Sequence, residues 1–352
     1  MSDSDRTDAL QGAVAAAFAS GDPLCLRGGG SKDFYGRRPT GTVLEVAAHR
    51  GVVAYDPTEL VLTARAGTPL ETLEALLAAE RQMLPFEPPH LGATATVGGT
   101  IACGLSGPRR PYAGAARDFV LGVRVVTGKG EVLRFGGQVM KNVAGYDVSR
   151  LMAGALGTLG VLLEVSVKVL PAPASEVTVV LEQGPAEALG AMNRLAGQPL
   201  PLSAAGHWDG RLHLRLSGSP TAVEEARRRL GGEAGPAGVW PDLREQCLPF
   251  FAGECPLWRV SVPPTAPPLD LPGEWILDWG GAQRWLRTDA EPQAVRVAAA
   301  GAGGHATLFR GGDRDADVFH PLGEGLAALH RRLKQAFDPR GILNPGRMYP
   351  GL

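Results

Sequence analysis

The fold of this chain is decided by a stretch of small residues that reads Ala95-Thr96-Val97-Gly98-Gly99-Thr100-Ile101-Ala102. Glycine, alanine and threonine stand here at positions where a compact core would favour leucine or valine. Small residues let another backbone or a ligand come close to the chain. The stretch therefore predicts a wall whose backbone faces a bound group.

A glycine loop lies before this stretch and reads Arg27-Gly28-Gly29-Gly30-Ser31-Lys32, after a short apolar strand expected at residues 24–26. Consecutive glycines can turn several backbone N–H groups toward one anion, with Ser31 and Lys32 as further donors. The loop is neither a Walker loop nor a Rossmann fingerprint, because G-x-x-x-x-G-K-[ST] and G-x-G-x-x-G do not occur in the chain. Taken alone, it predicts either a phosphate-binding loop or a flexible turn.

The composition is typical of a globular protein with two or three domains. The 352 residues are 44% hydrophobic and 20% charged, which is enough apolar material for a large core. A formal charge of −1 and a pI near 6.7 argue against binding to nucleic acid. No run reaches the ~18 apolar residues of a membrane-spanning helix, and the acidic start lacks the basic region of a secretory signal. We expect a cytoplasmic protein whose association with a membrane, if any, is peripheral and through partners.

The cysteines and histidines of the chain do not have the spacing of known metal-binding motifs. The four cysteines (Cys25, Cys103, Cys247 and Cys255) form no C-x-x-C pair, and the seven histidines form no H-x-H, H-x-x-H or H-E-x-x-H motif. We therefore expect no metal site and no iron–sulfur cluster in this chain.

Local signals place several elements. Residues 10–18 predict a helix closed by Gly21, and Thr68-Pro69-Leu70-Glu71 predicts a capping box at the start of another helix. Residues 119–127 and 131–135 predict a β-hairpin.

A domain boundary is expected near residue 174, because Pro171-Ala172-Pro173 ends regular structure. Beyond it, predicted strands alternate with helices near 185–196, 220–230 and 291–300. This pattern predicts a separate antiparallel sheet with helices on one side.

Five motifs in order resemble the FAD-binding domain of flavoproteins of the vanillyl-alcohol-oxidase (p-cresol-methylhydroxylase) type. The resemblance covers residues 20–173 closely and 338–346 less closely. It implies an α+β fold, with a two-subdomain FAD-binding domain at 1–173, an antiparallel-sheet cap at 174–310, and a segment 311–352 that returns to the first domain. The motifs are Pro88-Pro89-His90, Ala95-Thr96-Val97-Gly98-Gly99, Arg117-Asp118-Phe119-Val120-Leu121-Gly122, Lys141-Asn142-Val143-Ala144-Gly145-Tyr146-Asp147 and Gly157-Thr158-Leu159-Gly160.

The resemblance also implies roles for residues of this chain. The glycine loop would bind the pyrophosphate, residues 96–102 with Gly107 would line the ribityl and phosphate path, residues 141–147 would lie near the flavin ring, and residues 157–162 would touch the adenosine half. The implied FAD-binding residues are Arg27, Gly28, Gly29, Gly30, Ser31, Lys32, Pro89, His90, Ala95, Thr96, Gly98, Gly99, Thr100, Ala102, Gly107, Arg117, Asp118, Lys141, Asn142, Tyr146, Asp147, Gly157, Gly160, Val161 and Leu162.

The cofactor roles of the Arg117 and Asp118 pair and of Tyr146 each have a purely structural alternative. Arg117 and Asp118 form either the family's structural pair beside the cofactor or an ordinary ion pair, and Tyr146 is otherwise a core aromatic residue.

The chain departs from the family pattern in its glycine loop and its cap. Members that attach FAD covalently often have histidine in the loop, whereas this chain has Lys32-Asp33, so we expect non-covalent FAD. A glutamate that commonly precedes Gly157-Thr158-Leu159-Gly160 is replaced by Ala155-Leu156.

The cap offers His305 and Arg310 as candidate catalytic residues. Oxidation of a 2-hydroxy acid needs a base for the hydroxyl proton and a cation for the carboxylate. His305 and Arg310 could supply these groups, or His305 is a surface residue and Arg310 pairs with Asp313 or Asp315.

The short cap and the closing run at residues 337–349 resemble the FAD-binding subunits of bacterial glycolate oxidases. That resemblance implies a homologous larger FAD subunit, an iron–sulfur subunit and a small 2-hydroxy acid as partners. Three functions stay open: an FAD-carrying subunit that supports glycolate oxidation in a complex, a self-sufficient FAD-dependent 2-hydroxy-acid dehydrogenase, and a scaffold subunit with no redox role.

Overall fold

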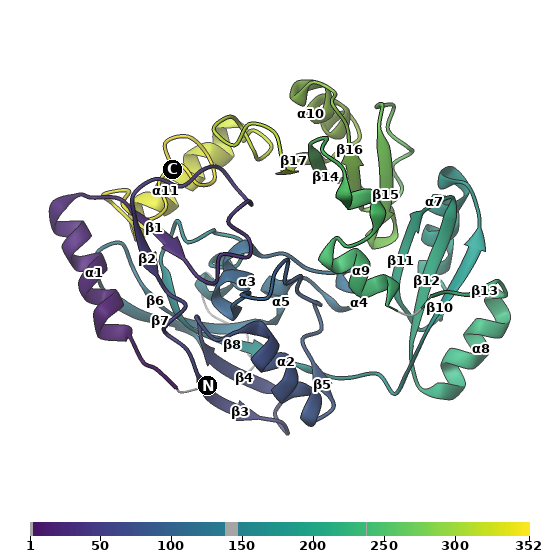
Figure 1. Ribbon diagram of the computed structural model, residues 1–352, viewed down its shortest axis with the longest axis horizontal. Helices are drawn as coiled ribbons and strands as arrows, with labels where there is room; N and C mark the ends of the chain where they lie inside the picture. Colours follow the sequence, from purple (N-terminus) through teal and green to yellow (C-terminus); the bar gives the residue numbers. More distant parts are fainter. Residues whose placement is uncertain (1–2, 138–146, 237) are drawn as a thin grey trace.

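A computed structural model describes residues 3–137, 147–236 and 238–352. Two antiparallel sheets dominate it, one at the lower left and one at the right of Figure 1. The first comes from strands before residue 170 and the second from strands between residues 175 and 310. The α+β fold class is confirmed.

The first sheet has five strands in the order β3 (Val52–Asp56), β4 (Val61–Arg65), β8 (Val161–Lys168), β6 (Val120–Val126) and β7 (Val132–Gly136). The predicted hairpin is confirmed as β6 and β7, which pair antiparallel from Gly122 with Gly136 to Val126 with Val132. Strand β8 is central and buried at seven of its eight positions. Two small pairs complete this half: parallel β1 (Leu24–Arg27) with β2 (Thr42–Glu45), and β5 (Gln82–Met83) with β9 (Leu170–Pro171).

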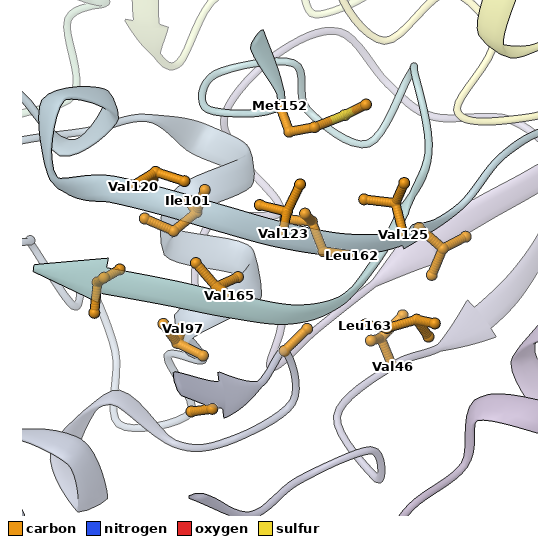
Figure 2. Packing of buried hydrophobic residues seen from close by; sticks show 14 of the residues in the cluster. Val46, Val97, Ile101, Val120, Val123, Val125, Met152, Leu162, Leu163 and Val165 are labelled. Atoms are coloured by element: carbon orange, nitrogen blue, oxygen red, sulfur yellow. The ribbon is translucent and has the colours of Figure 1, made fainter. Parts of the chain in front are cut away.

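Helix α3 (Val97–Cys103) explains why the small-residue stretch has its pattern. Val97 and Ile101, four positions apart on one face, are buried in the core of the first sheet. Figure 2 shows both side chains among valines of the neighbouring strands, near Val165 and Val120. The other face carries Gly98, Gly99 and Ala102, so the helix has one apolar face and one face of small residues.

Two helices frame this half and test the capping predictions. Helix α1 (Thr7–Ser20) ends at Gly21 with a φ of 84°, as expected. Helix α2 (Leu70–Ala79) begins where expected, but the capping box is wrong. The Thr68 hydroxyl lies 2.6 Å from the Arg65 carbonyl oxygen and also bonds to the Gly51 backbone, so it caps no N–H of the helix.

The second sheet has eight strands in the order β13 (Glu233–Ala234), β10 (Ser175–Glu182), β12 (Arg211–Gly218), β11 (Leu202–Trp208), β15 (Glu274–Asp278), β16 (Gln283–Arg287), β14 (Leu257–Ser261) and β17 (His305–Arg310). The three predicted helices are confirmed as α7 (Pro185–Ala196), α8 (Pro220–Leu230) and α10 (Pro292–Gly301). Helix α9 (Val239–Glu245) and the 3-10 turns η1 (Pro249–Ala252) and η2 (Trp279–Gly281) lie in its connections.

The C-terminal segment after α11 (Glu324–Phe337) lies against β1 of the first half (Figure 1). The Leu24 N–H donates to the Ile342 carbonyl oxygen (2.7 Å), and the Asn344 N–H donates to the Leu24 carbonyl oxygen (2.9 Å). The short helices α4 (Arg110–Ala113), α5 (Ala116–Phe119) and α6 (Val148–Leu151) lie between the elements already given. The C-terminal segment is therefore joined to β1 by backbone hydrogen bonds.

The two halves share an apolar cluster with polar contacts at its edge. Tyr35, Leu105 and Leu156 from the first half pack with Trp285 and Phe309 from the second sheet. The Trp279 indole Nε1 donates to the Gly107 carbonyl oxygen at 3.0 Å. The cap is thus held against the segment that follows α3.

Candidate functional site

A long cleft crosses the first half between the glycine loop, α3, the start of β8 and the C-terminal segment. It encloses about 900 Å³ of empty space. The sequence-predicted residues that line it are Arg27, Gly28, Gly29, Gly30, Ser31, Lys32, Thr96, Gly98, Gly99, Ala102, Gly157, Gly160, Val161 and Leu162. The fold therefore brings the glycine loop, the small-residue helix and the Gly157 to Leu162 segment together around one space.

The glycine loop presents unused backbone donors to this cleft. None of the N–H groups of residues 28–32 donates a hydrogen bond to another group of the described chain. A run of N–H groups without partners forms a concave site for an anion. A Cβ on Gly29 would lie 1.5 Å from the Thr94 carbonyl oxygen, so the loop keeps this course only with glycine there.

Lys32 adds a buried cation beside the loop. Its Nζ donates to the His90 carbonyl oxygen (2.9 Å) and to Ser31 Oγ (3.3 Å), which leaves one of its three N–H bonds free of these contacts. Burial lowers the pKa of the Lys32 ammonium, while Cys103 and Glu245 oppose the shift. An anion in the cleft would therefore stabilise the charged form of Lys32.

Two C-terminal residues that the sequence analysis did not select hold the loop in place. Asn344 accepts from the Leu26 N–H (2.7 Å) and donates to the Leu156 carbonyl oxygen (2.7 Å). Arg347 donates to the carbonyl oxygens of Asp33 (3.0 Å) and Arg37 (2.7 Å). Both line the cleft, and the only sequence signal for them is their place in the closing run.

The remaining lining residues that the sequence analysis missed are mostly apolar and small. Cys103 lies at the end of α3, and burial raises the pKa of its thiol. The others come from segments adjacent to the motifs, which is the signal that could have found most of them. They are Leu26, Asp33, Val46, Ala66, Met152, Ala155 and Leu156.

Several predicted cofactor residues lie outside the lining of this cleft. The His90 ring points to Glu74, with Nε2 2.9 Å from its carboxylate. Arg117 and Asp118 form an exposed ion pair at 3.8 Å, which fits the plainer alternative for them. Asp147 caps α6 by accepting from the Arg150 N–H (3.1 Å). Ala95 and Thr100 are buried beside the lining residues, and Lys141, Asn142 and Tyr146 lie outside the described residues.

A second, smaller cavity lies where the segment after α3 meets the cap. It encloses about 350 Å³ of empty space. Pro89 and Gly107, both predicted as cofactor residues, line it from the first half. Arg259 of β14 and Asp278 of β15 line it from the cap, and the sequence analysis selected neither.

The predicted catalytic residues line neither cavity. His305 is exposed at the start of β17, with its ring 6.4 Å from that of His320. The Arg310 guanidinium lies 4.6 Å over the Phe34 ring, and the alternative partner Asp315 pairs with Arg38 instead (3.2 Å). A catalytic role for His305 and Arg310 stays a prediction.

No group of three or more histidine, cysteine, aspartate or glutamate side chains in the described ranges could hold a metal ion. None of the described helices has the length and hydropathy to cross a membrane.

Comparisons with known proteins match this geometry. A family model for an FAD binding domain matches residues 5–136, and one for the C-terminal domain of FAD linked oxidases matches residues 313–348. Glycolate oxidase subunit GlcE of Escherichia coli (strain K12) is 52% identical, over 99% of this chain and 99% of that protein. Glycolate oxidase subunit GlcD of Bacillus subtilis (strain 168) is 35% identical, over 45% of this chain and 34% of that protein. The structure of 4-ethylphenol oxidase from Gulosibacter chungangensis has the same fold, with a TM-score of 0.70, 17% identity, and coverage of 98% of this chain and 88% of that one.

Proposed function

This chain belongs to the FAD-linked oxidase family that includes the bacterial glycolate oxidase subunits, and on that premise we propose that it is the FAD-binding subunit of a multisubunit glycolate oxidase. In this proposal the chain supports oxidation of glycolate to glyoxylate. The observation that carries it is the 52% identity to glycolate oxidase subunit GlcE over 99% of both chains. Identity of this extent covers the cleft, the cap and the C-terminal segment alike.

The residues of the large cleft fit FAD. The unused N–H groups of residues 28–32 suit the pyrophosphate, because they offer several donors to one anion. The small face of α3 leaves room beside them, since a Cβ on Gly99 would meet only the Thr96 hydroxyl, at 3.2 Å. We propose that FAD binds there without a covalent bond, since the loop offers lysine where covalent members often have histidine.

The chemistry divides between the cofactor and the chain. Bound FAD would supply the acceptor for the hydride equivalent that leaves the α-carbon of the hydroxy acid. The chain binds the pyrophosphate through its N–H groups and Lys32. The apolar cluster around Tyr35, Leu105 and Phe309 keeps water away from the region between the two halves.

Electrons must leave the chain by way of another molecule. We propose that the acceptor is a partner polypeptide, in a complex with a larger homologous FAD subunit and an iron–sulfur subunit. The name of the E. coli relative describes a subunit, which supports this assignment. We also propose that the complex works in the cytoplasm.

One observation favours a second function, that of a 2-hydroxy-acid dehydrogenase that works alone. The small cavity between α3 and the cap contains an arginine and a buried aspartate. These are the residue types that acid binding and proton transfer require.

Anaerobic reduction of the purified chain tests both functions. We expect a yellow protein with stoichiometric FAD that glycolate bleaches only when the partner subunits are present. Bleaching by glycolate of the chain alone would favour the self-sufficient dehydrogenase. A colourless chain that takes up no added FAD would contradict both and leave the scaffold function.

A further inference from the structure

The small cavity has walls from both halves of the molecule. Leu105, Gly107 and Pro108 form one side, and Arg259 and Trp285 belong to the other. The first side continues directly from α3, whose Ala102 and Cys103 line the large cleft. The two spaces therefore lie along one continuous segment of chain.

Arg259 is a cation without a carboxylate partner in this cavity. No ion pair joins it to an acidic side chain of the described residues. Its guanidinium lies over the Tyr35 ring, 5.9 Å from the centroid, and makes a long hydrogen bond of 3.5 Å from Nη2 to the Tyr35 hydroxyl. Arg244 in the same wall differs, because it pairs with Glu245 at 2.8 Å. A partly buried guanidinium favours an anion that neutralises it.

A second cation strengthens the positive potential beside the cavity. The Arg110 guanidinium lies 4.2 Å over the Trp279 ring. Burial lowers the pKa of Arg110, and the nearby Arg259 lowers it further. No acidic side chain within the described ranges forms an ion pair with Arg110, so an anion would be attracted by both arginines.

Gln246 supplies an unsatisfied acceptor on the same wall. Its side chain is buried, with 9% of the residue exposed, and its Oε1 has no hydrogen-bond partner in the described chain. A buried acceptor without a donor costs about 1–3 kcal/mol. A ligand with a hydroxyl group would satisfy it.

The Asp278 carboxyl repels an anion only in its ionised form. The carboxyl is buried and accepts from the Trp279 N–H (2.7 Å) and from Gln283 Nε2 (3.1 Å). Burial raises the pKa of Asp278 to about 7. The group therefore keeps its proton below about pH 7, is half ionised near pH 7, and repels an anion mainly above that pH.

We propose that this cavity binds a small 2-hydroxy acid, with Arg259 as the partner of its carboxylate and Gln246 as the acceptor for its hydroxyl group. The ligand class follows from one unpaired cation and one unpaired acceptor that line the same space. The space is smaller than the large cleft, about 350 Å³ against about 900 Å³ with the part open to solvent included in both, which favours a small acid. This inference rests on the proposed function, since it places a substrate site in this chain itself.

Calorimetric titration of the FAD-loaded, full-length chain with oxalate tests the arginine. Oxalate is a two-carbon acid that cannot give up a hydride. We expect Arg259→Gln to weaken oxalate binding by about tenfold or more. Arg296→Gln is the matched control, because Arg296 is a buried cap arginine over Trp258 that lines neither cavity. Equal affinities of wild type and Arg259→Gln, or no binding to wild type, would overturn the proposal.

A second measurement needs no variant and so does not depend on whether Arg259→Gln folds. Glycolate should displace oxalate from the wild-type chain at a several-fold lower concentration than acetate, which lacks the hydroxyl group. Equal displacement by the two acids would overturn the role of Gln246. FAD content, read from the absorbance of the same samples, separates the proposed FAD-binding function from the proposed acid site. Loss of FAD with acid binding intact contradicts the proposed function, whereas intact FAD with no acid binding contradicts only this site.

Discussion

The Leu26 N–H donates a hydrogen bond of 2.7 Å to Oδ1 of Asn344, although 318 positions separate the two residues. The same side chain donates to the Leu156 carbonyl oxygen, so one asparagine joins β1, the segment before β8 and the C-terminal segment. The glycine loop begins directly after β1. Its position in the cleft thus depends on the last ten residues of the chain.

Asn344→Ala should release the glycine loop. It leaves a buried N–H and a buried carbonyl group without partners, which costs about 1–3 kcal/mol for each. We expect a lower urea midpoint and loss of bound FAD together. Asn193→Ala is the control, since Asn193 Nδ2 also donates two bonds, to the Leu189 and Pro264 carbonyl oxygens in the cap. It should retain FAD, and loss of FAD from both variants would contradict the role of Asn344.

Gly99→Leu should fill the cleft and exclude FAD. Gly99 lies in α3, where a larger residue favours the helix, and an added Cβ meets only the Thr96 hydroxyl, at 3.2 Å. We expect at least about tenfold weaker FAD retention, from the cost of overpacking a fitted space. Gly12→Leu, on exposed α1 with no atom near its added Cβ, is the control. Flavin absorbance after gel filtration measures the outcome, and equal flavin in both variants would refute the cleft as the FAD site.

Gly29 is less suitable for this test. A side chain there would collide with the Thr94 carbonyl oxygen. Substitution would therefore disturb the loop itself, and FAD loss would not distinguish binding from folding.

The sequence predicts the local parts of this site well, because their signal is local. The glycine loop, the small face of α3 and the Gly157 to Leu162 segment are each rich in small residues, and the family resemblance of the ordered motifs favours a ligand over a flexible turn. Residues whose role depends on distant partners were missed. Asn344 and Arg347 act on segments more than 180 positions away, and no periodicity reports such a contact.

In the cap, too, the sequence pattern does not predict which charged residues matter. Arg259 and Asp278 lie in ordinary strands and belong to no motif. Arg259 is notable because no carboxylate of the described residues pairs with it, and Asp278 is notable because it is buried. His305 and Arg310 were predicted as base and carboxylate clamp because they are the histidine and the arginine of a cap stretch where relatives that oxidise 2-hydroxy acids often carry a histidine cluster. Neither lines a cavity in the described chain. Thr68 shows the opposite case, a correct prediction made for a wrong reason. The start of α2 was predicted from a capping box, but the Thr68 side chain caps no N–H group of that helix.

Asp278 should make the folded chain less stable as the pH rises. Its pKa is raised from 3.8 to about 7, mainly by burial, with Arg215 opposing and Glu87 adding to the shift. The native state therefore holds a proton that the unfolded state has lost between about pH 4 and pH 7, so stability falls across that window, by up to about 4 kcal/mol. Asp278→Asn should remove this contribution.

Urea denaturation at pH 4.5, 6 and 7.5 measures this effect. The difference between Asp278→Asn and wild type should grow in favour of the variant as the pH rises. Tyr112, which Asp278 faces and whose pKa is raised to about 12 by burial, does not titrate in this range. Parallel pH profiles for the two proteins would show that the Asp278 carboxyl keeps an ordinary pKa.

Glu87→Ala should destabilise the contact between the two halves strongly. Glu87 accepts from Arg215 at 2.9 Å and from Arg109 at 3.1 Å, and these arginines hold its pKa below the usual value although burial raises it. Only 4% of the Arg215 side chain is exposed, so removal of Glu87 leaves a buried charge poorly compensated. Breaking a buried pair in this way costs about 3–5 kcal/mol. Glu224→Ala, which removes the exposed partner of Arg227, should leave the urea midpoint unchanged. A midpoint for Glu87→Ala equal to that of Glu224→Ala would show that the Glu87 ion pairs add little to the contact between the two halves.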